Sequence, residues 1–244
     1  MEKQLAGPVI TGALVAMGVA FGGAAVGKGL VDARTGDRTV TVRGLSEKEA
    51  KADLALLPLR FARAGDSLSE VQGQVEGDLA TVRRFLAAEG FSASEVDLGR
   101  LQVVDQYARE YQPSGRVGAR YQVSQSVIVR TRNVDRVQVT TRHLNELVRQ
   151  GVVLQDYRGP AYLFTRLNEV RPGMIGEATA SARSGAEQFA RDSHSQLGGI
   201  SQATQGSFEI LGRDEVALGS DGGDEPSQVF KKLRVVTTVT YRLR

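Results

Sequence analysis

The sequence predicts an α+β fold, with mainly antiparallel sheets packed with three helices, plus one N-terminal transmembrane helix. Several segments alternate apolar and polar residues with a period of two, as half-buried antiparallel strands do. Three longer segments repeat apolar residues at helical spacing. Residues 4–27 carry no charged side chain. Together these patterns predict a mixed domain behind a single hydrophobic helix.

Composition limits the function classes. Of the 244 residues, 41% are hydrophobic and 24% are charged, as in ordinary globular domains. The net charge of +3 is small, and no block rich in Lys and Arg is interleaved with aromatic residues, so no nucleic-acid binding is expected. The chain has no cysteine, which excludes thiol nucleophiles, iron–sulfur clusters, Cys-ligated zinc and disulfides.

The uncharged N-terminal segment is long enough to cross a membrane. Its 24 residues span a hydrocarbon core of about 30 Å when helical. The alternatives are a cleaved signal peptide, whose Ala-x-Ala-like site is not clear here, and a buried core helix. We expect residues 1–35 to be a membrane anchor and connector, with residues 5–27 in the membrane, and residues 36–244 to be the folded body.

Charge does not decide on which side of the membrane the body lies. Lys3 precedes the uncharged segment, whereas Lys28, Arg34 and Arg38 follow it. The positive-inside rule then favours a cytoplasmic body. Large domains are translocated with little regard to such charges, so the orientation stays open on this criterion.

Seven strands are predicted from period-two patterns and β-branched residues. They span residues 39–44, 53–64, 96–107, 119–132, 152–166, 200–212 and 232–243. Pro58 has no amide hydrogen to give to a ladder, so it indicates an edge strand or a bulge. The last strand alternates most regularly and could lie in the middle of a sheet.

Three helices are predicted between these strands. Ser67 and Glu70 have capping-box spacing at the start of a helix that ends at Gly90. Asn133 is a predicted N-cap of a helix to Gln150, ended by Gly151. Pro172 suits the first turn of a long helix to Leu197, closed by Gly198 and Gly199. The expected inward stripe of this last helix is Ile175, Ala178, Ala182, Ala186, Phe189 and Ala190.

Few side chains are candidates for chemistry. Glu146 lies three residues after His143, and Asp192 lies two before His194, but neither spacing predicts a metal ligand set. Ser193, His194 and Ser195 are adjacent on a predicted helix and point apart, so they cannot form a triad.

Acidic residues are the other candidates. Glu47, Glu49 and Asp53 could act as acids or bases, but no His or Lys is placed beside them, and a structural role is the better interpretation. The acidic, Gly-rich stretch from 214 to 227 is expected to be a mobile loop. Asp221 and Asp224 there, with Glu225, lack the ligand spacing of a calcium loop. We therefore predict no catalytic, cofactor-binding or metal-binding residue, no cofactor and no enzyme activity.

Three blocks of sequence, separated and in order, resemble the SIMPL-domain family. The first block is Val40 to Glu47, followed by Lys51 to Ala55. The second is Leu167 to Ile175, running into Glu177 to Thr179 and Ala186 to Ala190, and the third is Lys231 to Val239. The resemblance covers nearly all of residues 38–244.

This resemblance implies a location and a mode of action. The N-terminus is similar to the branch of the family with a membrane anchor, which implies a single-pass protein of the inner (cytoplasmic) membrane with its body in the periplasm. The family is linked to stress defence and to homo-oligomers, and it has no established catalytic residues. We expect a non-enzymatic, self-assembling envelope protein with a structural or stress-related role. The alternative is an adaptor or binding module for another envelope protein or a lipid.

Overall fold

The computed structural model describes residues 16–29, 38–108, 118–213 and 225–244. Residues 16–29 form a helix, and among the described residues no helix is long and apolar enough to cross a membrane. The predicted span at residues 5–27 lies partly outside the described residues. The loop predicted at residues 214–227 also lies outside the described residues, except for residues 225–227, which form the short 3-10 helix η3 (Glu225–Ser227).

The chain divides into two compact units. The first comprises Met1–Ser46, Gly173–Ser207 and Val235–Arg244, and the second comprises Glu47–Pro172 and Phe208–Arg234. Strands β1 (Thr39–Lys51), β6 (Leu197–Gly212) and β7 (Phe230–Leu243) contribute residues to both units. The predicted α+β class with antiparallel sheets is confirmed.

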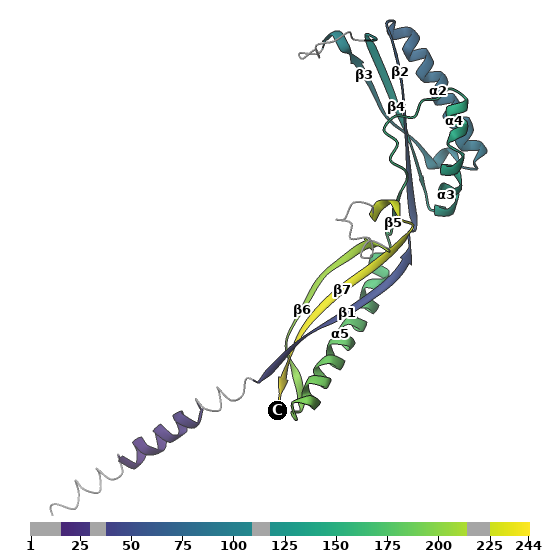
Figure 1. Cartoon of the computed structure of the whole chain (residues 1–244). Helices are drawn as coiled ribbons and strands as arrows, with labels where there is room; N and C mark the ends of the chain where they lie inside the picture. Colours follow the sequence, from purple (N-terminus) through teal and green to yellow (C-terminus); the bar gives the residue numbers. More distant parts are fainter. Residues whose placement is uncertain (1–15, 30–37, 109–117, 214–224) are drawn as a thin grey trace, which may run out of the picture. The chain divides into compact units, whose positions relative to one another are not determined.

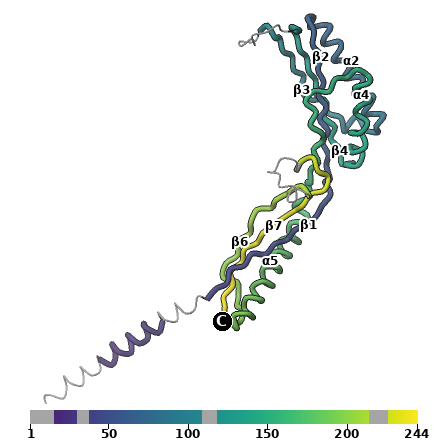
Figure 2. Tube along the Cα trace, viewed as in Figure 1, coloured from purple at the N-terminus to yellow at the C-terminus, as the bar shows by residue number. Residues whose placement is uncertain are grey.

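A three-stranded sheet and one helix build the first unit. The strand order is β1-β7-β6, and α5 (Leu167–Asp192) runs along one face of the sheet (Figure 1). The first strand and the last strand of the chain therefore lie side by side (Figure 2). Hydroxyl groups of Thr41 and Thr240 meet across this pair at 2.9 Å. The predicted position of the last strand in mid-sheet is confirmed.

The core of the first unit lies between α5 and two of the three strands. Its buried apolar residues come from β1, α5 and β7: Val42, Ala182, Ala186, Val239 and Tyr241. The buried stripe of α5 repeats every four residues and consists of Met174, Ala178, Ala182, Ala186 and Ala190. The predicted alanines are confirmed, but the prediction for Ile175 and Phe189 was wrong. Those two residues lie off the four-residue row, and Phe189 is exposed.

Gly44 is the point of closest approach between β1 and α5. A Cβ atom at this position would lie 1.8 Å from the Ala178 carbonyl oxygen and 2.5 Å from the Ala182 amide nitrogen. Only glycine fits against the helix backbone here. Two residues on, the Ser46 hydroxyl donates to the Glu177 carboxylate at 2.8 Å. The alanine stripe and Gly44 together bring the helix onto β1.

The ends of α5 differ from the prediction. The helix begins five residues before Pro172, which lies inside it. It ends at Asp192 because His194 takes a left-handed conformation (φ 52°), and the amides of His194 and Ser195 bond to the carbonyls of Arg191 and Ala190. This is the Schellman arrangement that glycine usually closes. Gly198 and Gly199, predicted to end the helix, lie in β6 instead.

The second unit packs helices on one face of a four-stranded sheet with strand order β3-β4-β2-β5 (Figure 1). Its strands are β2 (Leu54–Gly65), β3 (Val96–Asp105), β4 (Tyr121–Thr131) and β5 (Ala161–Leu163), and its helices are α2 (Leu68–Ala88), α3 (Val134–His143) and α4 (Asn145–Arg149). Short 3-10 helices occur at Ala93–Glu95 (η1) and Gln106–Ala108 (η2). The core side chains include Leu57, Leu59, Phe61, Val75, Val82, Leu86, Val123, Val127, Val137 and Leu147.

The predicted helix from Asn133 to Gln150 is two helices, so the body described here has four helices rather than three. The Leu147 amide bonds to the Leu144 carbonyl, a tighter 3-10-type bond that interrupts the ladder. The N-cap at Asn133 is confirmed, since its side chain accepts from the Arg136 amide at 3.1 Å. Gly151 has a positive φ (87°) beyond the second helix, as expected for its predicted end.

Three other local predictions were wrong. Ser67 makes no capping bond, and the capping box forms at Ser92 and Glu95 instead. The strand predicted at residues 152–166 is reduced to the three residues of β5. Pro58 lies in an inner strand, β2, opposite Ile128 of β4. It is tolerated there because β5 pairs only with Leu54–Leu56 and ends before reaching it.

The close contact at Gly44 gives a stability prediction. Gly44→Ala should lower the free energy of unfolding by about 1–3 kcal/mol, because the new methyl group collides with backbone atoms of α5. The matched control is Gly176→Ala in α5, where a Cβ meets nothing within 4 Å. It should raise the same free energy by about 0.5–1 kcal/mol. Urea unfolding measures both, and equal effects of the two substitutions would contradict the contact.

Candidate functional site

A polar cleft of about 650 Å³ opens in the second unit, where the end of β1, the start of α3 and the segment before α5 meet. Six charged side chains line it: Lys51, Asp53, Arg132, Asp135, Arg166 and Glu169. Two of the sequence blocks that resemble the SIMPL family meet here, one ending at Ala55 and the other beginning at Leu167. The cleft is therefore built from segments more than a hundred residues apart in the chain.

Asp53 is the best-anchored of these side chains. Its carboxylate accepts from the Thr165 amide at 2.8 Å, from the Thr165 hydroxyl at 3.2 Å and from Arg166 Nε at 2.9 Å. Burial alone raises the pKa of Asp53, but the hydrogen bonds from Thr165 and Arg166 together lower that pKa below its ordinary value. The ionised carboxylate thus ties the beginning of β2 to the beginning of α5.

The other charged side chains of the cleft differ in whether they have an ion-pair partner. Lys51 Nζ donates to both carboxylate oxygens of Asp135 at 2.8 and 2.7 Å. Arg166 also lies 4.0 Å from Glu169. Arg132 is exposed, and its guanidinium makes no hydrogen bond or ion pair with any residue that the structure describes. It is the cation of the cleft that remains available to an anionic group.

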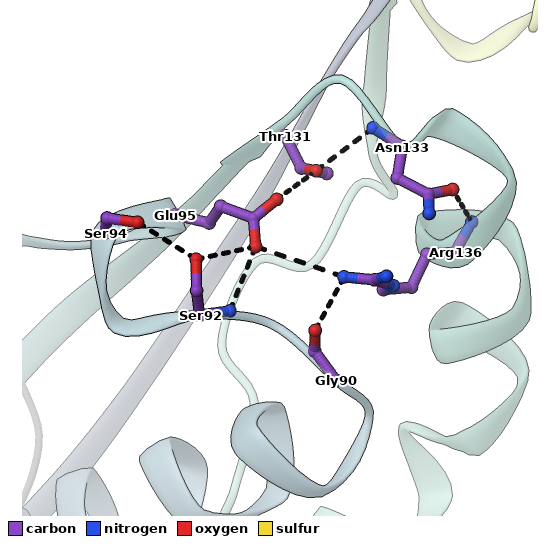
Figure 3. Close-up of polar contacts among 7 residues, drawn as sticks. All are labelled: Gly90, Ser92, Ser94, Glu95, Thr131, Asn133 and Arg136. Carbon is purple, nitrogen blue, oxygen red and sulfur yellow. Dashed lines mark hydrogen bonds and ion pairs between the residues drawn. The ribbon is translucent and has the colours of Figure 1, made fainter.

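A network of polar contacts fixes the wall that carries Arg132 (Figure 3). The Thr131 hydroxyl donates to Glu95, and the Asn133 amide donates to the same hydroxyl at 3.1 Å. Glu95 also closes its capping box with Ser92 at 2.9 Å. The hydrogen bonds from Thr131 and then from Ser92 lower the pKa of Glu95.

Arg136 completes this network. Its guanidinium donates to the Gly90 carbonyl at 2.6 Å and lies 4.0 Å from Glu95 (Figure 3). It also stacks over the Phe91 ring, 5.7 Å from the ring centre. The corner between β4 and α3 is thus held by charge-assisted bonds to the segment after α2, which positions the cleft wall from behind.

The histidines singled out in the sequence lie away from the cleft lining. The partner of His143 is Glu89 rather than Glu146: His143 Nδ1 lies 2.9 Å from the Glu89 carboxylate. The Thr140 hydroxyl also donates to the Glu89 carboxylate, at 3.1 Å. This contact joins α3 to the end of α2. His194 closes α5. Among the described residues, no group of three or more His, Asp and Glu side chains could hold a metal ion.

The acidic candidates are separated. Asp53 lies in the cleft, whereas Glu47 lies 3.5 Å from Arg234 Nε. Glu49 is exposed. Asp221 and Asp224 lie outside the described residues. The cleft lining combines three carboxylates with three cationic side chains and forms a charged surface.

A second candidate surface is the edge strand β6 in the first unit. Every residue from 199 to 207 is exposed, and residues 197–207 carry no charge. Beside this strand, a groove of about 490 Å³ separates it from α5 and is lined by Arg183, Glu187, Ile200 and Tyr241 among others. The core below α5 comes mainly from the other two strands, so residues 199–207 are exposed and their outer backbone groups are unpaired in this sheet.

Neither the cleft nor the β6 edge was predicted from the sequence. Arg132, Asp135 and Arg166 carry no motif, and only the fold brings them to Asp53. The uncharged run in β6 was visible in the sequence. The edge was expected instead at the strand with Pro58, because strand order cannot be read from one strand's composition.

The hydrogen bonds of Asp53 predict a contribution to stability that is lost at low pH. Because its folded pKa lies below the ordinary value, its stabilisation is complete above about pH 4 and is lost as the pH falls through the folded pKa. Asp53→Asn should lower the free energy of unfolding by about 1–3 kcal/mol at pH 7 and by much less at pH 3. The control is Asp97→Asn, an exposed carboxylate on β3, which should change little. A loss of the same size at both pH values would contradict the assignment.

Comparison with known proteins agrees with the resemblance seen in the sequence blocks. The model of the SIMPL family, described as a protein of unknown function (DUF541), matches residues 40–241. A search among curated proteins gives no match. The family match includes β1, the cleft and nearly all of β7. The chain therefore belongs to the SIMPL family.

Proposed function

We propose that this chain is a non-enzymatic envelope protein that assembles with copies of itself through the edge of β6. The observation that carries the proposal is the exposed, uncharged run in that strand. Proteins protect edge strands with charges, prolines, bulges or covering elements, because an open edge templates pairing with another chain. Residues 197–207 have neither a charge nor a proline, and residues 199–207 are exposed.

The other edge strands among the described residues are protected. On β1, which forms the opposite edge of the same sheet, Arg43, Glu47, Lys48 and Glu49 are exposed. In the four-stranded sheet, β3 carries Asp97, Arg100 and Asp105 and an irregular register between Leu98 and Leu101, and β5 is only three residues long. The contrast singles out β6 as the pairing edge.

A second copy of the chain is the occupant that fits this edge. Two β6 strands pairing antiparallel around a two-fold axis would place no like charges opposite each other. Eleven residues give an edge of about 35 Å. The side chains of Ser201, Gln202, Thr204 and Gln205 can bond across such a pair without desolvating a charge.

The membrane tether is part of the same proposal. It is supported by the 24 uncharged residues and by Met17, Val19, Phe21 and Val26, which are exposed on the helix of residues 16–29. The inner-membrane anchor, the periplasmic body and the structural or stress-related role are proposed from the resemblance of the chain to the membrane-anchored branch of the SIMPL family.

The tether has a direct test. The protein extracted from membranes should keep its N-terminus in an intact-mass measurement, and protease should shave the body from spheroplasts. A mature N-terminus near residues 25–30, or a body protected from protease, would contradict the tether.

Charges on the β6 edge should block the assembly. The double variant Ser201→Lys with Gln205→Lys should be at least about ten-fold weaker in self-association, because like charges then face each other across the pair. The full chain in detergent is weighed by light scattering over a concentration series. The double variant Ser181→Lys with Ser184→Lys, at two exposed positions of α5, is the charge-matched control and should assemble normally. A double variant that assembles like the wild type would contradict β6 as the contact.

A complementary pair sharpens the result. The double variant Ser201→Glu with Gln205→Glu should also fail to assemble alone. Mixed with the double Lys variant, it should form an assembly that contains both chains. Restoration on mixing distinguishes repulsion at the edge from misfolding of either variant.

The alternative function is an adaptor for another envelope protein or a lipid. The observation that favours it is the cleft, where Arg132 has no described partner. A wild-type chain that stays monomeric in detergent at all concentrations would favour this adaptor over self-assembly.

A further inference from the structure

A small polar hollow of about 170 Å³ lies on the four-stranded sheet of the second unit. It is lined by Arg60 from β2, Arg100 and Gln102 from β3, and Ser124 and Ser126 from β4. On β2 and β4 these residues alternate with the buried side chains of the core. Since successive side chains point to opposite faces, the hollow lies on the face that the helices leave open.

The side chains of the hollow are held in place by one another. Arg60 Nη2 donates to Gln102 Oε1 and to Ser124 Oγ, both at 3.2 Å. Ser124 itself is buried. The guanidinium of Arg60 is thereby oriented across two neighbouring strands. Its remaining ion pair, with Asp156 at 3.6 Å, joins two exposed groups and is weak.

A bulge in β3 brings Arg100 to the hollow. The register shifts between Leu98 and Leu101, and the buried amide of Gln125 donates to the Gly99 carbonyl at 3.0 Å. A side chain at Gly99 would lie 2.3 Å from Ser126 Oγ, so the bulge needs this glycine. Bulges of this kind redirect single side chains next to binding sites.

The hollow has an excess of hydrogen-bond donors. The Arg100 guanidinium makes no hydrogen bond or ion pair with any described residue. Two guanidinium groups and two hydroxyls from three strands converge on a space below the size of a drug-like pocket. A tetrahedral oxyanion offers acceptors in several directions to such donors, and guanidinium binds phosphate through paired bonds.

We propose that this hollow binds a single phosphate group, either free inorganic phosphate or the phosphate of a phospholipid headgroup. Arg100 supplies the main charge, Arg60 the oriented second donor, and Ser126 a hydroxyl at the rim. The hollow is smaller than a nucleotide, so the rest of a ligand of that size stays outside it.

The test uses the full-length chain in a phosphate-free detergent. Inorganic phosphate is titrated by calorimetry, and native mass spectrometry measures retention of added phosphatidylglycerol against diacylglycerol, which has no phosphate. Phosphate binding supports the free ligand, and selective retention of phosphatidylglycerol supports the headgroup. In either case Arg100→Gln should weaken binding by about ten-fold or more.

The matched control is Arg130→Gln, an exposed arginine on the same face of β4 that does not line the hollow. It should bind like the wild type, and both variants should melt at the wild-type temperature. If Arg100→Gln and Arg130→Gln weaken phosphate binding equally, the effect comes from general surface charge, and the proposed site is overturned. Binding of neither probe by the wild type would overturn it as well.

Discussion

The contact between α5 and β1 at Gly44 is the constraint on which the first unit depends. With the helix backbone against this residue, a helix about 10 Å wide covers only two strands that lie about 4.8 Å apart. The buried residues accordingly come from β1, β7 and α5. In the third strand, β6, Leu197 packs against this core and Arg171 of α5 stacks over Phe208, whereas residues 199–207 between them are exposed. One close packing contact thus produces the surface that we assign to assembly.

The second unit uses polar contacts where the first uses close packing. Asp53, held by Thr165 and Arg166, joins segments 113 positions apart, and Glu95 and Arg136 hold the neighbouring corner. Asp53 and Glu95 are half-buried and each accepts several hydrogen bonds, so they fix the geometry of the surrounding surface. Arg132 in the cleft and Arg100 on the open face of the sheet take no part in these contacts, and neither guanidinium has a hydrogen bond or ion pair with a described residue.

Local sequence predicted the elements with strong local signals. The alternation in β7, the Asn133 cap and Gly90 after the first long helix are as expected, because period and capping act over a few residues. Ser67 is the N-cap residue of α2, but its hydroxyl lies 3.1 Å from the Ser69 hydroxyl and makes no bond to a helix amide. The end of α5 failed because His194 takes the left-handed role normally given to glycine.

The candidate surfaces could not be predicted for a different reason. The cleft requires Asp53 to meet Arg166, and the hollow requires a bulge at Gly99 opposite Ser126; both are contacts between distant segments. The lack of charge in β6 is present in the sequence, but its meaning depends on strand order. The same composition in an inner strand such as β4, which is paired on both sides, would leave no edge open to another chain.

Hydrogen–deuterium exchange of the full chain in detergent tests pairing at β6 most directly. About half of the amides in residues 199–207 face β7 in any edge strand, and the other half face outward. If β6 pairs between copies, the outward amides should exchange more slowly at high protein concentration than at high dilution, while amides in β1 do not change. Equal exchange of residues 199–207 at all concentrations, in a chain that light scattering shows to be oligomeric, would contradict assembly through this edge.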